Sequence, residues 1–119
     1  NKLHPCLNQA AQYNFTKNFE VALVLRKGNA TLITPQTSAV FSFDNPDKSK
    51  LGHPFAKPLL LWQKIYQAVS IQGQTVLDPF CGSGSASIAA LRYGLVPIAV
   101  DINIHHVNLT KSNLAAELA

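Results

Sequence analysis

The sequence predicts an α/β fold with a parallel βαβ unit in its second half. Short apolar runs alternate there with segments of helical periodicity, and a glycine-rich turn joins the first apolar run to the helix that follows it. The composition agrees with this prediction, because 47% of the residues are hydrophobic and only 13% are charged. Such a balance is typical of a chain with a buried core.

Local signals bound the elements of the second half. We expect a helix to begin at Pro58, where the missing N–H of proline costs nothing, and to end at Gly73. Its apolar face recurs every four residues, at Leu61, Ile65 and Val69. The elements expected to follow are a strand over 75–77, a helix over 85–92, a strand over 95–100 and a helix over 105–119. Together they form a right-handed βαβ unit with flanking helices.

The first half is predicted to contain a strand hairpin. Residues 19–26 are almost wholly apolar after Glu20, which fits a strand covered on both faces. Lys27-Gly28-Asn29 supplies residues that tolerate a tight turn, and residues 30–33 then resume the apolar character. Residues 40–43 fit a short third strand, before a polar loop that extends to Gly52.

A chain of 119 residues can hold one domain. It begins at Asn1 and contains no methionine, so we interpret it as a fragment of a longer protein. The single domain over 1–119 divides into an N-terminal segment, 1–52, with the predicted hairpin and loop, and a ligand-binding βαβ part, 53–119.

Charge and cysteine content limit the possible partners and the cellular compartment of the protein. The net charge of +4 permits a polyanionic partner, but the charges are scattered, so the indication is weak. No apolar run reaches the length of a membrane span and no signal segment opens the chain, so we expect no membrane partner. Cys6 lies near the terminus and Cys81 in the glycine turn, which favours a reduced, cytoplasmic protein.

The glycine-rich turn carries the clearest functional signal. A parallel strand that ends in such a turn creates a ligand site at its carboxyl end. Gly82 and Gly84 let a ligand approach the backbone closely, and the small Ser83 and Ser85 avoid filling the space. The N–H groups at the start of the following helix favour a carboxylate or another anion.

An acidic residue ends each of the two strands. Asp78 is placed to accept a hydrogen bond from an ammonium group, and Asp101 to accept from the ribose hydroxyls of an adenosine. The turn lacks the third glycine of a dinucleotide fingerprint and the lysine of a phosphate loop. A nucleoside that carries an amino acid, such as S-adenosylmethionine, fits these residues.

Two motifs resemble those of a known family. Asp78-Pro79-Phe80-Cys81-Gly82-Ser83-Gly84 is similar to the first motif of the amino-group DNA methyltransferases, which methylate adenine N6 or cytosine N4. His53-Pro54-Phe55-Ala56-Lys57-Pro58 resembles their second cofactor-binding motif, His-Pro-x-x-Lys-Pro. In their β group a strand hairpin comes first, the His-Pro-x-x-Lys-Pro motif second and the glycine loop third. Residues 20–32 resemble that hairpin, so the resemblance covers residues 19–118. The resemblance implies a partial Rossmann-like, S-adenosylmethionine-dependent methyltransferase fold.

The resemblance also implies a cofactor site. It places His53, Phe55 and Lys57 near the methionine carboxylate and Asp101 on the ribose. Ser85 keeps the hydroxyl of the threonine that is usual in the family. The full set of residues implied around S-adenosylmethionine is His53, Phe55, Lys57, Asp78, Phe80, Gly82, Ser83, Gly84, Ser85 and Asp101.

The catalytic motif of the family, Asp- or Asn-Pro-Pro-Tyr or -Phe, is absent. Asn45-Pro46-Asp47 is the nearest sequence, and a solvated turn explains it better. In the β order the motif lies upstream of the hairpin, so no catalytic residue is assigned in this chain. The expected partners are double-stranded DNA, through the full-length protein, and a second copy in a homodimer. We predict no metal site, because the adjacent His105 and His106 point in different directions.

Other functions and roles fit parts of the same pattern. An RNA base methyltransferase has a nearly identical glycine loop, and a non-catalytic module would bind the cofactor or only a protein partner. Asp101 is also a candidate cap of the following helix, and Asp78 a candidate buried structural acid. Trp62 and Tyr66 are expected in the core.

The missing motif gives the first prediction. The 119-residue chain alone should transfer no methyl group from S-adenosylmethionine to DNA, because nothing in it is expected to hold the target base. Incorporation of labelled methyl groups into duplex DNA measures this, with a complete amino-methyltransferase as the positive control. Incorporation above the protein-free background would refute it.

Overall fold

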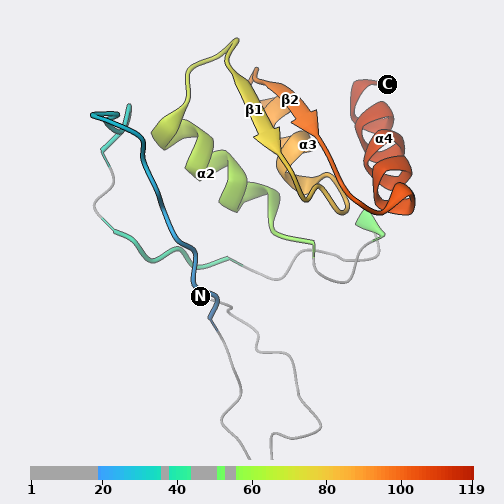
Figure 1. The fold of residues 1–119 in the computed structure, drawn as a ribbon, viewed down its shortest axis with the longest axis horizontal. Coiled ribbons are helices and arrows are strands. Elements are labelled where there is room, and N and C mark those ends of the chain that lie inside the picture. Colours follow the sequence, from blue (N-terminus) through green and yellow to red (C-terminus); the bar gives the residue numbers. More distant parts are fainter. Residues whose placement is uncertain (1–18, 36–37, 44–50, 53–55) are drawn as a thin grey trace, which may run out of the picture.

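The computed structural model describes residues 19–35, 38–43, 51–52 and 56–119. The elements of the second half follow the predicted order (Figure 1). They are α2 (Leu59–Val69), β1 (Thr75–Asp78), α3 (Ser85–Arg92), β2 (Val96–Ala99) and α4 (Ile104–Leu118). Each begins and ends close to the predicted residues, and Pro58 is the N-cap of α2 instead of its first residue.

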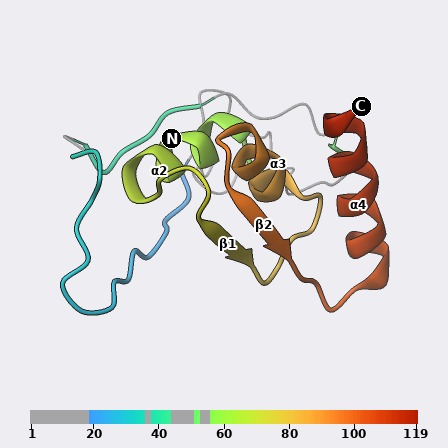
Figure 2. The same cartoon turned by 90° about the horizontal axis from the view of Figure 1, so that it is seen from above.

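The two strands pair in parallel, from Thr75 opposite Val96 to Asp78 opposite Ala99. The predicted βαβ unit is therefore confirmed. Helix α3 contacts both strands and lies between α2 and α4 (Figures 1 and 2). Since both strands run in the same direction, the residues that follow their carboxyl ends meet at one edge of the sheet.

The core lies between α2, α3 and the sheet. Its fully buried members are Tyr66, Ala89, Ala90 and Leu95, and Leu59, Trp62, Val76 and Tyr93 pack against them. Alanines on α3 have no side chain beyond Cβ, so the Tyr66 ring of α2 can approach that helix closely. The prediction that Trp62 and Tyr66 belong to the core is confirmed.

The Tyr66 hydroxyl joins α2 to the first turn of α3. It donates a hydrogen bond to the Ala86 carbonyl at 3.1 Å. Burial, with a smaller contribution from the negative charge of Asp78, raises the pKa of Tyr66 to about 12. The phenol therefore stays neutral and keeps its donor proton at any pH at which the protein would be used.

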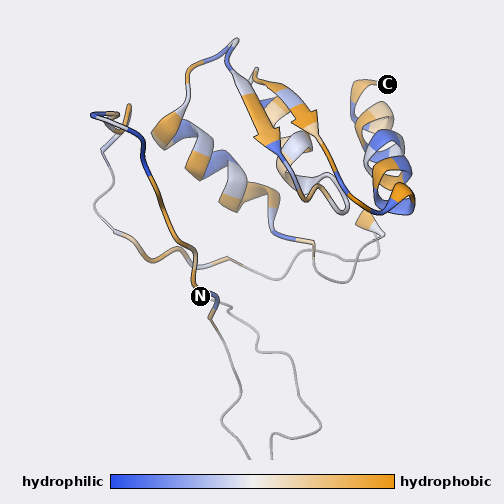
Figure 3. Ribbon diagram, in the orientation of Figure 1, coloured by the Kyte–Doolittle hydropathy of each residue, from blue (hydrophilic) through white to orange (hydrophobic). Residues whose placement is uncertain are grey.

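The other face of the sheet is open among the described residues. Leu77, Val96 and Ile98 alternate with half-buried residues and are each at least half exposed. Figure 3 shows apolar residues along both strands. A parallel strand that is covered on both faces needs a second layer, and within the described residues only one layer of helices is present. The expected burial of the 75–77 strand thus holds for one face.

The predicted strand hairpin is wrong. The turn forms at Gly28 and Asn29, where Gly28 has φ of +64°. Neither flank of that turn is a strand, and the apolar side chains at 21 and 23–25 are between 80% and 88% exposed. A strand requires a neighbour that accepts its N–H groups, and the described residues provide none for this run.

The predicted third strand over 40–43 is also wrong, because only an isolated bridge at Phe43 is found there. Aromatic contacts attach this segment to α2 instead. The Phe41 and Phe43 rings lie 6.3 Å apart, and Lys64 Nζ lies 5.9 and 5.7 Å from their centroids. The Ile33 N–H donates to the Ala68 carbonyl at 2.7 Å, so the backbone at Ile33 is also attached to α2.

No helix in the described part of the chain is long and apolar enough to cross a membrane.

The buried hydroxyl gives a prediction on stability. Tyr66→Phe should lower the free energy of unfolding by about 1 kcal/mol, because the Ala86 carbonyl loses its buried donor. Urea denaturation measures this change. Tyr93→Phe is the matched control, since that half-buried tyrosine packs on the same cluster and its hydroxyl bonds to nothing within the described residues. Equal losses in the two variants would contradict the assigned role.

Candidate functional site

The glycine-rich loop over 79–84 connects β1 to α3 and is closed by backbone hydrogen bonds. The Gly84 N–H donates to the Cys81 carbonyl at 2.7 Å, which forms a tight turn before the helix. The Cys81 N–H donates to the Val100 carbonyl at 2.9 Å, and the Val100 N–H to the Asp78 carbonyl at 2.8 Å. The pairing of the two strands therefore continues into the loop, which holds it at the edge of the sheet.

Gly82 and Gly84 have φ of +53° and +79°, in the region that other residues rarely adopt. Gly84 is also the N-cap of α3, and no side chain caps this end. The first N–H groups of a helix have no acceptor within the helix, and the helix dipole places positive potential there. The start of α3 is therefore suited to an anionic group, as the sequence predicted.

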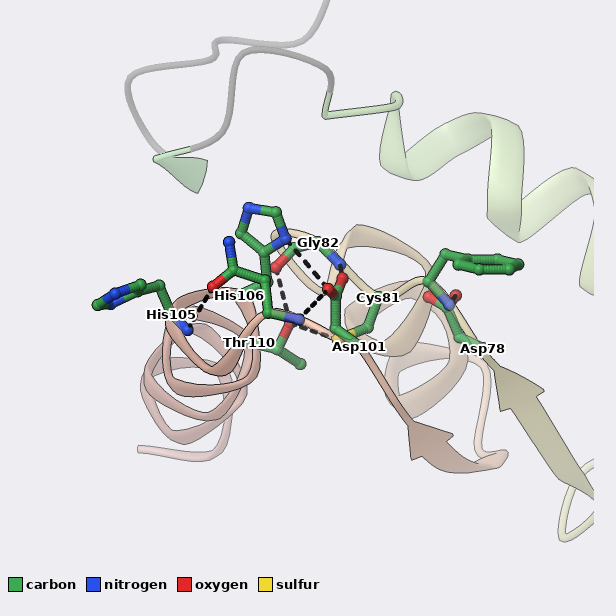
Figure 4. A network of polar contacts seen from close by, with 9 residues as sticks. Asp78, Cys81, Gly82, Asp101, His105, His106 and Thr110 are labelled. Atoms are coloured by element: carbon green, nitrogen blue, oxygen red, sulfur yellow. Dashed lines mark hydrogen bonds and ion pairs between the residues drawn. The ribbon is translucent and has the colours of Figure 1, made fainter.

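Asp101 joins the end of β2 to the glycine loop (Figure 4). Its Oδ2 accepts from the Gly82 N–H at 3.0 Å, and its Oδ1 accepts from the Asn103 N–H at 2.9 Å. His106 Nδ1 lies 3.3 Å from the same Oδ1. These donors, Asn103 first, lower the pKa of the Asp101 carboxyl. A carboxylate has about four lone-pair sites, so about one remains on Oδ2 for a ligand hydroxyl.

Asp101 does not cap α4. The N-cap is Asn103, whose side chain accepts from the His105 N–H at 2.9 Å. The alternative interpretation of Asp101 as a helix cap is therefore wrong. Its contact with Gly82 instead shapes the ligand loop directly.

Asp78 is half-buried at the end of β1 and accepts from the Phe80 N–H at 3.2 Å. Burial raises the pKa of the Asp78 carboxyl; the Phe80 N–H opposes this, and the negative charge of Asp101 adds to it. The negative charges of the two carboxyl groups therefore repel each other beside the loop. A positively charged ligand group placed near both would offset this repulsion, which is the chemistry expected for an ammonium site.

Three side chains of α4 that were not predicted as site residues also belong to the site. His106 contacts Asp101, as described above. The Thr110 hydroxyl lies 3.1 Å from the Gly82 carbonyl and 3.3 Å from Cys81 Sγ. Asn113 Nδ2 donates to the Ser83 carbonyl at 2.9 Å. Their spacing along the predicted last helix placed them on one face, but no sequence signal showed which element that face would contact.

Ser83 and Ser85, also predicted as site residues, are buried and do not line open space. Phe80, within the loop, is 85% exposed. Lys57 forms an ion pair with Glu20. His53 and Phe55 lie outside the described residues. Within the described part of the chain, no three His, Cys, Asp or Glu side chains gather as metal ligands.

The comparisons with known proteins show the family of the chain. A family model described as DNA methylase matches residues 34–112, more than half of the chain. The type II methyltransferase M.HpaI of Haemophilus parainfluenzae is 34% identical over 71 residues, which are 60% of this chain and 23% of that protein. The putative methylase YubD of Escherichia coli K12 is 31% identical over 97 residues, 82% of this chain and 42% of that protein. The chain spans less than half the length of these relatives.

A solved structure extends the likeness to the fold. The M1.HpyAVI–SAM complex superposes with a TM-score of 0.75 at 24% sequence identity. The match covers 95% of this chain and 58% of that chain. The predicted partial Rossmann-like fold is therefore confirmed.

The glycine conformations give a third prediction. Gly84→Ala should lower the free energy of unfolding by about 2–4 kcal/mol, from the positive φ and from overlap with α4. The new Cβ would lie 2.9 Å from Thr110 Cγ2. Gly28→Ala is the control, because Gly28 also has positive φ but a Cβ there meets nothing within 4 Å. Urea denaturation separates the two, and losses of equal size would contradict the proposed overlap.

Proposed function

Since the chain belongs to the DNA methylase family, we propose that it forms the S-adenosylmethionine-binding part of a DNA amino-methyltransferase. The reaction of the whole enzyme would transfer a methyl group to the exocyclic amine of adenine (N6) or cytosine (N4). The match to a DNA methylase model favours this function over RNA base methylation. Several relatives carry corresponding names, among them the DNA adenine methyltransferase YhdJ of Escherichia coli K12, which is 36% identical over 58 residues.

The observation that carries the proposal is the pair of strand-end carboxyl groups beside the glycine loop. S-adenosylmethionine combines an ammonium group, a carboxylate, a sulfonium and a ribose. Asp78 would accept from the ammonium, whose positive charge would offset the burial and the nearby negative charge that raise the pKa of this carboxyl. The lone-pair site that remains on Asp101 Oδ2 would accept from a ribose hydroxyl. The uncapped N–H groups at the start of α3 would favour the carboxylate.

The residues around this loop have supporting roles in the proposal. Gly82 allows the backbone to approach the ligand, because it has no side chain to fill the space. Gly84 has no Cβ to clash with Thr110 of α4. Phe80 is exposed at the rim of the loop and offers an apolar surface to the ligand. His53, Phe55 and Lys57 would lie near the methionine carboxylate. The bound cofactor supplies an electrophilic methyl group, and the protein's part here is to bind and orient it.

DNA enters the proposal through the whole protein. A target base has to leave the duplex before its amine can reach the methyl group, and a separate aromatic motif would hold it there. We assign no catalytic residue to this chain. Its proposed contribution is cofactor affinity and orientation, in a cytoplasmic enzyme that acts on double-stranded DNA.

Binding of S-adenosylmethionine and its pH dependence test the proposal. Titration calorimetry should show one site at neutral pH, with an affinity that falls as the pH falls through the pKa of Asp78. That pKa lies above 3.8, the usual value for the group, so the loss should begin at a higher pH than for an ordinary aspartate. Asp101 has a lowered pKa and stays ionised in this range, which keeps the loop bound to β2.

Asp78→Asn keeps the shape of the side chain and removes its charge. It should weaken binding about 10- to 100-fold at neutral pH, the magnitude of a lost charge-assisted hydrogen bond, and should abolish the dependence on acid pH. Glu117→Gln is the control, since it removes an acid that pairs with Arg92 and does not contact the loop. No binding by the wild-type chain, or an unchanged acid limb in Asp78→Asn, would contradict the proposal.

A further inference from the structure

One face of α4 packs against the glycine loop. His106, Thr110 and Asn113 are four and three residues apart, so they share a face of the helix. His106 contacts Asp101, which itself binds the loop, and Thr110 contacts the loop directly (Figure 4). Asn113 also donates to the loop, at the Ser83 carbonyl. The loop is therefore bound on two sides, by the residues after β2 and by α4.

Thr110 is the centre of this contact and is only 2% exposed. Its hydroxyl reaches the Gly82 carbonyl, and its Cγ2 would lie 2.9 Å from a Cβ added at Gly84. The helix approaches the loop so closely that only glycine fits opposite Thr110. Gly82 is half-buried and Thr110 is buried, so water has limited access to replace this donor at the Gly82 carbonyl.

Asn113 binds the next carbonyl of the loop. Its Nδ2 donates to the Ser83 carbonyl at 2.9 Å and to the Leu51 carbonyl at 3.3 Å. Successive loop carbonyls, those of Gly82 and Ser83, are thus turned toward α4. In a trans peptide the N–H points opposite to the carbonyl, so the N–H groups that follow these carbonyls are turned away from α4.

Because the loop contains two glycines, other contacts have to fix the orientation of its peptides. Gly82 and Gly84 can adopt φ of either sign at similar cost, so the glycines themselves do not fix the peptides between them. The hydrogen bond from the Gly84 N–H to the Cys81 carbonyl restrains the second peptide, and the first depends more on its contact with α4. A flip would exchange carbonyl and N–H positions and present the wrong group to a ligand. The donors on α4 favour one orientation, because only a carbonyl can accept from them.

We propose that Thr110 and Asn113 are positioning residues that fix the orientation of the glycine-loop peptides for the ligand. The inference rests on the proposed function, since the ligand is taken to be S-adenosylmethionine. Neither side chain needs to touch the ligand. Their effect is to hold the loop, before binding, in the conformation that binding requires.

Thr110→Val tests the inference, because it removes the hydroxyl and keeps the volume and the branched shape of the side chain. It should weaken S-adenosylmethionine binding about 5- to 10-fold in titration calorimetry. In the unliganded chain it should speed amide hydrogen exchange at residues 82–84, measured by NMR. Thr110→Ser keeps the donor and should bind within about twofold of the wild type. Asn113→Leu should show the same two effects as Thr110→Val.

Glu117→Gln separates positioning from general stability. It breaks the Arg92–Glu117 pair, in which Nε and Oε1 lie 2.6 Å apart and which joins α3 to α4 away from the loop. This variant should lower the melting temperature without changing affinity or exchange at 82–84. Wild-type affinity and exchange in Thr110→Val, or an equal loss in Glu117→Gln, would overturn the inference. If the wild type binds no S-adenosylmethionine, the proposed function fails, and the exchange data still decide the role of α4.

Discussion

The hydrogen bond from the Gly82 N–H to Asp101 is the interaction on which the site depends. It joins the loop after β1 to the residue that follows β2, and it exists because the two strands are parallel and end at the same edge. Without it the loop would still be held by its backbone hydrogen bonds and by α4, but Gly82 would lose its contact with the residue that follows β2. With it, the same carboxylate both shapes the loop and retains one acceptor position for a ligand. In the proposed function, the structure of the loop and the recognition of the ligand therefore use the same side chain.

The polarity of the site arises from the different surroundings of two aspartates. Asp101 accepts from several donors, and its negative charge is stabilised. Asp78 is half-buried with a single described donor, and its negative charge is disfavoured. One acid is satisfied by the protein and the other is left for a cation, at the end of a loop that also offers N–H groups to an anion. A zwitterionic amino acid matches this division of charge.

Local sequence signals predicted the elements of the second half and the acidic strand ends, and long-range contacts account for what they missed. Helix α3 is bounded by glycine and by its alanine-rich composition, which are local properties. The hairpin failed because a strand depends on a partner, which composition does not supply. Thr110 and Asn113 were missed because their role depends on which element α4 packs against. The predicted cofactor-binding residues His53 and Phe55 lie outside the described residues.

Helix α3 contacts α2, α4 and both strands, and all residues from Ser85 to Ala90 are buried. Most of them are alanine or serine, because the sheet, α2 and α4 all pack against this helix and leave little room for larger side chains. Because of this crowding, we expect fewer substitutions to be tolerated in α3 than on the face of the sheet that is open among the described residues. Divergence between relatives should therefore be read differently at the two places: a change in α3 requires compensating changes in two other helices, whereas Leu77 and Ile98 face no second layer within the described residues.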